Sequence, residues 1–252
     1  MPLKLPQVIG HRGSAAYAPE NSLESIHTAA DIGTSWVELD VKLTKDDVPI
    51  LFHDDDLSRT TNGSGLVRET RYEDLQQLEC GSWFGESFTG IKIPTLEEAI
   101  DVLIERELGL NLEIKACPGR EKETAEAALD ILSQYWDDHQ RLLISSFDPV
   151  SLETAHHIAN DWHRGLLLAA ESNGEINPNW AELADHLDVK TVNLGTDIAT
   201  QDIINEVIER DYIPLVYTVN DPDQARQMQS WGVTAVFSDE PDLIAENMLT
   251  IH

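Results

Sequence analysis

The sequence predicts an α/β protein, a (β/α)8 TIM barrel with a small insertion after its second strand and the hairpin that follows it. Short apolar segments alternate with amphipathic segments from one end of the chain to the other. The apolar segments are hydrophobic throughout, which is typical of parallel strands covered on both faces. About eight such units in a chain of 252 residues match the usual size of a closed barrel.

One pair of strands departs from the β/α alternation. Residues 36–43 and 48–52 both have strand-like composition, and only Thr44 to Asp47 separate them. This turn is too short for a crossover, so the two strands should pair antiparallel as a hairpin. Residues whose numbers sum to about 92 then face each other, which brings His53 close to Asp40.

The other elements follow in β/α order. Residues 7–10 predict a buried strand, and residues 21–33 predict a helix. Thr95 and Glu98 have the spacing of a capping box, which predicts the start of a helix. Further strands are expected at residues 110–114, 142–145, 164–168, 191–194, 214–219 and 235–237, with helices between them and a last helix from Pro241.

Residues 55–93 are longer than an ordinary barrel loop. Loops of more than ~15 residues are usually functional, so we interpret this segment as an insertion on the top of the barrel. No linker divides the chain, and we expect a single domain over residues 1–252. Trp83 and Phe84 are expected to anchor the insertion to the barrel, with substrate contact as the alternative.

The composition excludes several classes of protein. The chain has 17 basic and 46 acidic residues and a net charge of −29, which argues against binding to nucleic acids or anionic membranes. With 41% hydrophobic residues it can bury a full core. We see no signal peptide or membrane span. Two cysteines, Cys80 and Cys117, suit reduced thiols and a cytoplasmic location.

Polar residues gather at the carboxyl ends of the expected strands, where a β/α barrel places its reactive groups. They are His11 and Arg12, Glu38 and Asp40, His53 and Asp54, Glu113 and Lys115, Ser145 to Phe147, and Tyr217 to Asn220. We therefore expect one active site at this end of the barrel.

Three of these residues are carboxylates that should converge. Glu38 and Asp40 alternate along a strand and face the same way, and Glu113 comes from the neighbouring strand. Three buried acids cannot all be ionised without a cation. Oxygen ligands select Mg²⁺, Ca²⁺ or Mn²⁺ over zinc. The alternative is a set of surface acids, which is plausible in so acidic a chain.

His11 and His53 form a candidate proton-transfer pair, because imidazole titrates near neutral pH. Arg12 and Lys115 add positive charge that suits a phosphate. In the alternative, His11 is a structural histidine and Arg12 only an ion-pair partner of Glu20. A metal, two cations and two imidazoles together predict phosphoryl transfer.

Several motifs follow one another in a fixed order along the chain. They are His11-Arg12-Gly13, Pro19-Glu20-Asn21, Glu38-Leu39-Asp40-Val41, His53-Asp54, Arg59-Thr60-Thr61-Asn62-Gly63, Ile93-Pro94-Thr95-Leu96-Glu97-Glu98, Leu112-Glu113-Ile114-Lys115, Val216-Tyr217-Thr218-Val219-Asn220 and Phe237-Ser238-Asp239-Glu240-Pro241-Asp242. This series resembles that of the glycerophosphodiester phosphodiesterases. It spans nearly the whole chain, and its order is far more specific than any single motif.

The resemblance implies roles for the motif residues. The metal would be held by Glu38, Asp40 and Glu113, acid–base catalysis would fall to His11 and His53, and the phosphate would be bound by Arg12 and Lys115. Glu20, Asn21 and Asp54 are expected to support these groups, Asp54 by contact with His53. Tyr217 stands where the family often has Trp, and Phe147 is expected in the substrate pocket or, equally, in the core.

The resemblance also implies a reaction. A glycerophosphodiester such as glycerophosphocholine or glycerophosphoethanolamine would be cleaved through a cyclic phosphate to sn-glycerol 3-phosphate and an alcohol. The alternatives are a lysophospholipase D or a cyclising phosphodiesterase acting on a lipid, and a noncatalytic phosphate- or metal-binding protein. The expected partner is the small substrate, without nucleic acid or stable membrane association, and the chain is expected to be a monomer or homodimer.

Overall fold

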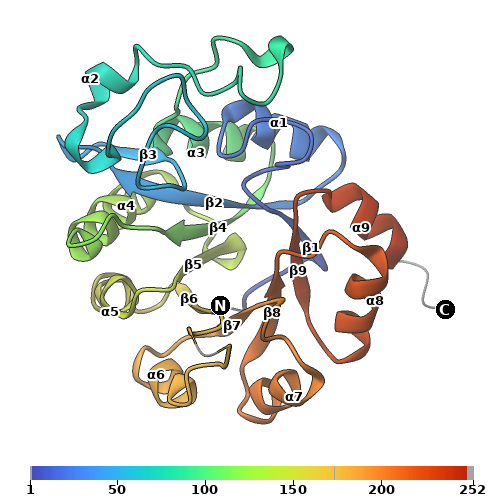
Figure 1. The fold of residues 1–252 in the computed structure, drawn as a ribbon. Helices are drawn as coiled ribbons and strands as arrows, with labels where there is room; N and C mark the ends of the chain where they lie inside the picture. The colour runs from blue at the N-terminus through green and yellow to red at the C-terminus, as the bar shows by residue number, and fades with distance from the viewer. Residues whose placement is uncertain (1, 173, 249–252) are drawn as a thin grey trace.

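The computed structural model describes residues 2–172 and 174–248. Within these ranges, eight parallel strands close into a barrel, with β9 paired to β1 and β1 to β2 (Figure 1). The barrel strands are β1 Val8–Gly10, β2 Trp36–Leu43, β4 Gly109–Ile114, β5 Leu142–Ser146, β6 His163–Leu168, β7 Thr191–Gly195, β8 Ile213–Tyr217 and β9 Ala235–Ser238. The predicted fold class is confirmed.

Helices follow the strands and form the outer layer of the barrel (Figure 1). They are α1 Leu23–Asp31, α3 Leu96–Glu105, α4 Glu121–Tyr135, α5 Pro149–Ile158, α6 Trp180–His186, α7 Gln201–Glu209, α8 Pro222–Ser230 and α9 Pro241–Met248, with the 3-10 turn η3 at His139–Arg141. The capping box is confirmed at α3. Thr95 Oγ1 accepts from Glu98 N at 3.1 Å, and Glu98 Oε2 accepts from Thr95 N at 2.8 Å.

The hairpin has the predicted register. β3, Pro49–Leu51, runs antiparallel to β2 and pairs Leu51 with Val41 and Pro49 with Leu43. Phe52 N then donates to Asp40 O at 3.1 Å, which brings the chain back to the carboxyl end of β2.

One strand ends earlier than expected. We predicted a strand over residues 214–219, whereas β8 ends at Tyr217. Beyond it, Val219 N donates to Phe237 O at 2.8 Å, so the chain still follows β9 but has left the strand. The apolar character of Val219 comes from its burial against the outer helices and not from a place in the sheet.

The segment between β3 and α3 lies over β3 and α1 at one end of the barrel (Figure 1). Its regular parts are short: η1 Val67–Glu69, α2 Tyr72–Leu75 and η2 Glu86–Phe88. Its buried residues form a separate small cluster with the hairpin: Ile50, Phe52, Leu57, Val67, Leu75, Cys80, Ile93 and Cys117. Both cysteines are free thiols.

The apolar side chains of β2 point away from the barrel axis. Val37, Leu39 and Val41 belong to the cluster that packs against the helices. Because side chains alternate along a strand, Glu38 and Asp40 must point into the barrel. Deeper in the barrel an apolar plug fills the space, with Ile9, Trp36, Leu143, Leu215 and Phe237 among its members. The carboxylates therefore lie above an apolar floor.

Candidate active site

Three carboxylates converge at the carboxyl ends of β2 and β4. Asp40 is the direct neighbour of Glu113 in the parallel pairing of the two strands. One oxygen of Glu38, one of Asp40 and one of Glu113 lie within 4.8 Å of one another, and all three residues are buried. The structure thus brings together the three residues that the sequence predicted as metal ligands.

The electrostatics of this cluster suit a cation. Burial raises the pKa of Glu38 well above its ordinary value, and the charges of Asp40 and Glu113 raise it further. Burial and the charge of Asp40 also raise the pKa of Glu113. Glu38 Oε1 is buried and has no hydrogen-bond partner among the described residues. An unpartnered buried carboxylate oxygen costs free energy, and a divalent cation would satisfy it.

Asp40 is held in place by two hydrogen bonds with Asn21. Asn21 Nδ2 donates to Asp40 Oδ2 at 2.8 Å, and Asn21 Oδ1 accepts from Asp40 N at 3.0 Å. Burial alone would raise the pKa of Asp40, but Lys115 and Arg12 hold it below its ordinary value. Asp40 is therefore an anion in the folded protein.

The turn after β1 places Arg12 over the acids. Arg12 has φ 49°, and its backbone N donates to Glu38 Oε2 at 2.9 Å. A Cβ at Gly10 would overlap the carbonyl oxygen of Gly13, so the tight turn requires glycine at this position. The Arg12 side chain extends to Glu20 at 2.7 Å and to Asp40 at 3.5 Å. The expected ion pair with Glu20 forms, and Arg12 still faces the cluster.

His11 is held by a carboxylate from the last strand of the barrel. Its Nδ1 donates to Asp239 Oδ1 at 2.7 Å. Asp239 in turn accepts from Asn220 Nδ2 at 2.7 Å. Burial alone would raise the pKa of Asp239, but the hydrogen bond and the charge of His11 hold it below its ordinary value. The other ring nitrogen, Nε2, lies 3.9 Å from Glu38 Oε2 and faces the cluster.

His53 is held by a neighbouring carboxylate and, through it, by the insertion. Its Nδ1 donates to Asp54 Oδ1 at 2.6 Å, and burial lowers the pKa of the imidazole. Arg59 donates to Asp54 at 2.6 Å and 2.9 Å and to Glu20 at 2.7 Å and 2.8 Å. The hydrogen bonds from Arg59 lower the pKa of Asp54. Arg59 therefore links Asp54, the partner of His53, and Glu20, the partner of Arg12, in one hydrogen-bonded network.

Lys115, Phe147 and Tyr217 come from the ends of β4, β5 and β8 and also lie at the mouth of the barrel. Lys115 Nζ lies 2.7 Å from Glu113 Oε1 and 5.3 Å from the centre of the Phe147 ring. Phe147 is 41% exposed, so it is a surface of the site and not part of the core. Its ring meets Tyr217 edge to face at 5.8 Å, and the Tyr217 hydroxyl donates to Leu168 O at 2.7 Å.

The sequence profile of the Glycerophosphoryl diester phosphodiesterase family matches residues 11–243, which include every charged side chain of the site from His11 to Asp239. The chain belongs to this family. The resemblance of the ordered motifs and the enzyme class that it implied are confirmed.

Relatives and solved structures of the family match along the whole chain. A phosphodiesterase of Oleispira antarctica, solved in complex with the product sn-glycerol-3-phosphate, is 40% identical with a TM-score of 0.93, and 98% of each chain is covered. A glycerophosphodiester phosphodiesterase of Caldanaerobacter subterraneus subsp. tengcongensis is 31% identical over 245 residues, which are 94% of this chain and 95% of the relative. One of Bacillus subtilis is 31% identical over 252 residues, with 93% and 84% covered.

Two residues of this phosphodiesterase site were not singled out by the sequence analysis, although both lie in the quoted motifs. Asp239 supports His11 from 228 positions away, and no local pattern shows such a contact. Closure of the barrel was the available signal, because it places the ends of the first and last strands side by side. Arg59 lies in the insertion, and its place at the start of the Arg59-Thr60-Thr61-Asn62-Gly63 motif was the available signal.

Two cavities open beside the acids, on either side of β2. The Lys115 cavity has a volume of 430 Å³ and includes His53, Lys115 and Phe147 in its lining. The Trp83 cavity has a volume of 420 Å³ and includes His11 and Trp83. Trp83 is 40% exposed and lines this cavity, while its indole Nε1 donates to Cys80 O within the insertion, so anchoring of the insertion and contact with the substrate both stay predictions.

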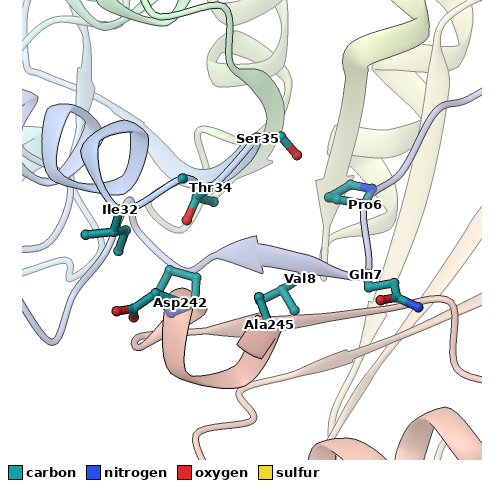
Figure 2. A pocket seen from close by; sticks show the side chains of 10 residues that line it. Pro6, Gln7, Val8, Ile32, Thr34, Ser35, Asp242 and Ala245 are labelled. Carbon is teal, nitrogen blue, oxygen red and sulfur yellow. The ribbon is translucent and has the colours of Figure 1, made fainter. Parts of the chain in front are cut away.

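A third cavity lies away from the site, between the end of α1, the start of β1 and α9 (Figure 2). Its volume is 190 Å³. The charged side chain in its lining is Asp242, which already accepts a hydrogen bond from Tyr17. It offers no group for phosphoryl transfer.

None of the helices in the described ranges is long and apolar enough to cross a bilayer.

Proposed function

We propose that the chain hydrolyses glycerophosphodiesters, such as glycerophosphocholine and glycerophosphoethanolamine, to sn-glycerol 3-phosphate and an alcohol. The observation that carries this proposal is the buried carboxylate cluster of Glu38, Asp40 and Glu113, flanked on each side by a histidine that is bound to its own carboxylate. A 40% identical relative solved with sn-glycerol-3-phosphate supports the substrate class.

The cluster would hold one divalent cation, with Mg²⁺, Ca²⁺ and Mn²⁺ as the candidates for oxygen ligands. The raised pKa of Glu38 and its unpartnered oxygen support this assignment. When bound, such a cation offsets the charge of the carboxylates and polarises a phosphoryl oxygen.

Arg12 and Lys115 would bind the remaining phosphoryl oxygens. Both cations are kept beside the cluster by acids, Arg12 by Glu20 and Lys115 by Glu113. Because both stay charged at neutral pH, they stabilise the negative charge that develops on the phosphate during transfer.

The two histidines would move the protons. In the first step one imidazole removes the proton of a free glycerol hydroxyl, which attacks the phosphorus, and the other gives a proton to the departing alcohol. In the second step water opens the cyclic phosphate with the roles reversed. Asp54 and Asp239 orient the imidazoles and leave Nε2 of each ring for the substrate.

A substrate panel tests the proposal. The purified chain is incubated with glycerophosphocholine and with lysophosphatidylcholine in the presence of Mg²⁺, Ca²⁺ or Mn²⁺, and products are followed by phosphorus NMR. We expect sn-glycerol 3-phosphate from glycerophosphocholine. Turnover of the lipid alone would identify a lysophospholipase D, and a final cyclic product would identify a cyclising enzyme.

We also infer that residues 1–252 act as one catalytic domain with residues 55–93 as its insertion. The ion pairs from Arg59 to Glu20 and Asp54 support this, because they join the insertion to the site. The cytoplasmic location and the monomeric or homodimeric state stay predictions. Buried free thiols support a reducing compartment, and burial raises the pKa of Cys80 to about 12.

A further inference from the structure

A phosphodiester at the acidic cluster has two ester arms, and the site has two cavities to receive them. The Lys115 cavity is formed by the ends of β2, β4 and β5 and the loops that follow β3, β4 and β5. The Trp83 cavity is formed by the loops that follow β1, β8 and β9 and by the insertion. In the barrel, β4 and β1 are the two neighbours of β2, which carries Glu38 and Asp40. The cavities therefore lie on opposite sides of the cluster.

Aromatic faces form one wall of the Trp83 cavity. The indole Nε1 of Trp83 donates to Cys80 O at 2.8 Å, which fixes the ring at its polar edge. Phe84 meets Trp83 edge to face at 5.6 Å and meets Phe88 in the same way at 5.3 Å. The wall is thus held in place before any ligand binds.

Carboxylates form the other wall. Glu20, Asp239 and Glu240 line the cavity together with Arg12. Arg12 is paired with Glu20 and His11 with Asp239, both at 2.7 Å, whereas no ion pair to Glu240 occurs among the described residues. Within those residues, no cation of the chain lies over the ring of Trp83 or Phe84 either. An indole that is 40% exposed and an unpaired carboxylate in the lining of one cavity are the groups that bind organic ammonium ions.

The charges of the Lys115 cavity are largely paired. Lys42 and Lys115 line it together with Asp55 and Glu113, and each lysine lies 2.7 Å from one of these acids. Its aromatic ring, Phe147, is already covered by the ammonium group of Lys115 at 5.3 Å. A second cation over this ring would meet the charge of Lys115, whereas the hydroxyl groups of a neutral glycerol arm find donors and acceptors in the ion pairs.

We propose that the Trp83 cavity binds the cationic ammonium group of the alcohol arm, as in choline or ethanolamine esters, through Trp83, Phe84 and Glu240. The proposal rests on the hydrolysis of glycerophosphodiesters proposed above and names the class of alcohol that this chain prefers. The neutral glycerol arm then occupies the Lys115 cavity.

A pair of isosteric esters tests it. Glycerophosphocholine is compared with the glycerophosphoryl ester of 3,3-dimethylbutanol, which replaces the nitrogen of choline by carbon and removes the charge. We expect kcat/KM for the choline ester to be about tenfold higher in the unaltered chain. Trp83→Leu and Glu240→Gln should each reduce this ratio about threefold.

Two control variants match these substitutions outside the cavity. Tyr135→Leu removes an aromatic residue that is 41% exposed on α4, and Glu246→Gln removes a charge from α9. Both should keep the full ratio. The controls should cleave the neutral ester at the rate of the unaltered chain, and every variant should still cleave it, which shows that each is folded and active.

The outcomes separate the two proposals. A chain that cleaves neither ester contradicts the proposed function. A chain that cleaves both esters equally well, or that keeps its preference in both Trp83→Leu and Glu240→Gln, contradicts the ammonium site and leaves the hydrolase intact.

Discussion

The two histidines at the mouth of the barrel have the same kind of partner but different supports. His11 donates to Asp239 at 2.7 Å, and His53 donates to Asp54 at 2.6 Å. Asp239 is held by the neutral amide of Asn220, which belongs to the barrel, whereas Asp54 is held by the guanidinium of Arg59 from the insertion.

The difference shows what the insertion contributes. Arg59 is a partly exposed cation of the insertion. It binds Asp54, which orients His53, and Glu20, which is paired with Arg12. The His11 side needs no such contribution, because closure of the barrel places β9 beside β1. The orientation of His53 by Asp54 should therefore depend on the insertion, and the orientation of His11 by Asp239 should not.

The largest effects should come from the histidines themselves, and they should be of similar size. His11→Ala and His53→Ala each remove one proton-transfer group and should lower kcat by about 10²- to 10⁴-fold. Metal binding, measured by calorimetry, should stay, since neither residue is a proposed ligand. A variant with the kcat of the unaltered chain would remove that histidine from the mechanism.

Arg59→Ala should have the next largest effect. Loss of its charged hydrogen bonds should lower kcat about tenfold, a value at the low end because the side chain is partly exposed. Arg59→Lys keeps the charge but not the two-pronged geometry and should recover part of the loss.

Double variants locate this effect on one side of the site. Arg59→Ala combined with Asp54→Asn should lose less activity than the sum of the two single effects, because the bond from Arg59 to Asp54 is already weakened, whereas its effect should add to that of Asp239→Asn. Additivity with Asp54→Asn would contradict the link between Arg59 and His53.

Asn220→Ala should have a smaller effect, because it removes a hydrogen bond from a neutral donor to Asp239. We expect kcat to fall about threefold in steady-state assays. A larger fall in kcat for Asn220→Ala than for Arg59→Ala would show that the hydrogen bond to Asp239 matters more than the hydrogen bonds to Asp54, which contradicts the ranking.

The smallest effect on activity should come from a substitution at the start of α3, a helix of the barrel that carries both histidines. Thr95→Ala removes the cap of α3 and should lower the free energy of unfolding by about 1 kcal/mol in denaturant titrations. Its kcat should be that of the unaltered chain. A selective loss of activity would show that α3 supports one side of the site.

Local sequence patterns predicted much of the secondary structure of this protein correctly. The strand bounds of β2, the register of the hairpin and the capping box all depend on residues close in sequence, and all three agree with the structure. The convergence of Glu38, Asp40 and Glu113 was predictable too, because strand alternation and barrel closure are general rules.

Other features depend on contacts that no local pattern contains. The pairing of His11 with Asp239 joins the two ends of the chain. The four hydrogen bonds of Arg59 depend on how an irregular segment folds back over the barrel. The exposure of Trp83, 40%, depends on the same irregular fold of the segment, and the composition of the segment does not contain it.

The most direct test of the account is metal binding by the acidic cluster, measured together with activity. The chain is stripped with a chelator, titrated with Mg²⁺, Ca²⁺ or Mn²⁺ in a calorimeter, and assayed on glycerophosphocholine, with Glu38→Gln and Glu246→Gln compared in parallel. We expect the stripped chain to be inactive, one ion to restore it, and Glu38→Gln to lose binding while Glu246→Gln keeps it. Full activity after exhaustive chelation, or unchanged binding by Glu38→Gln, would contradict the account.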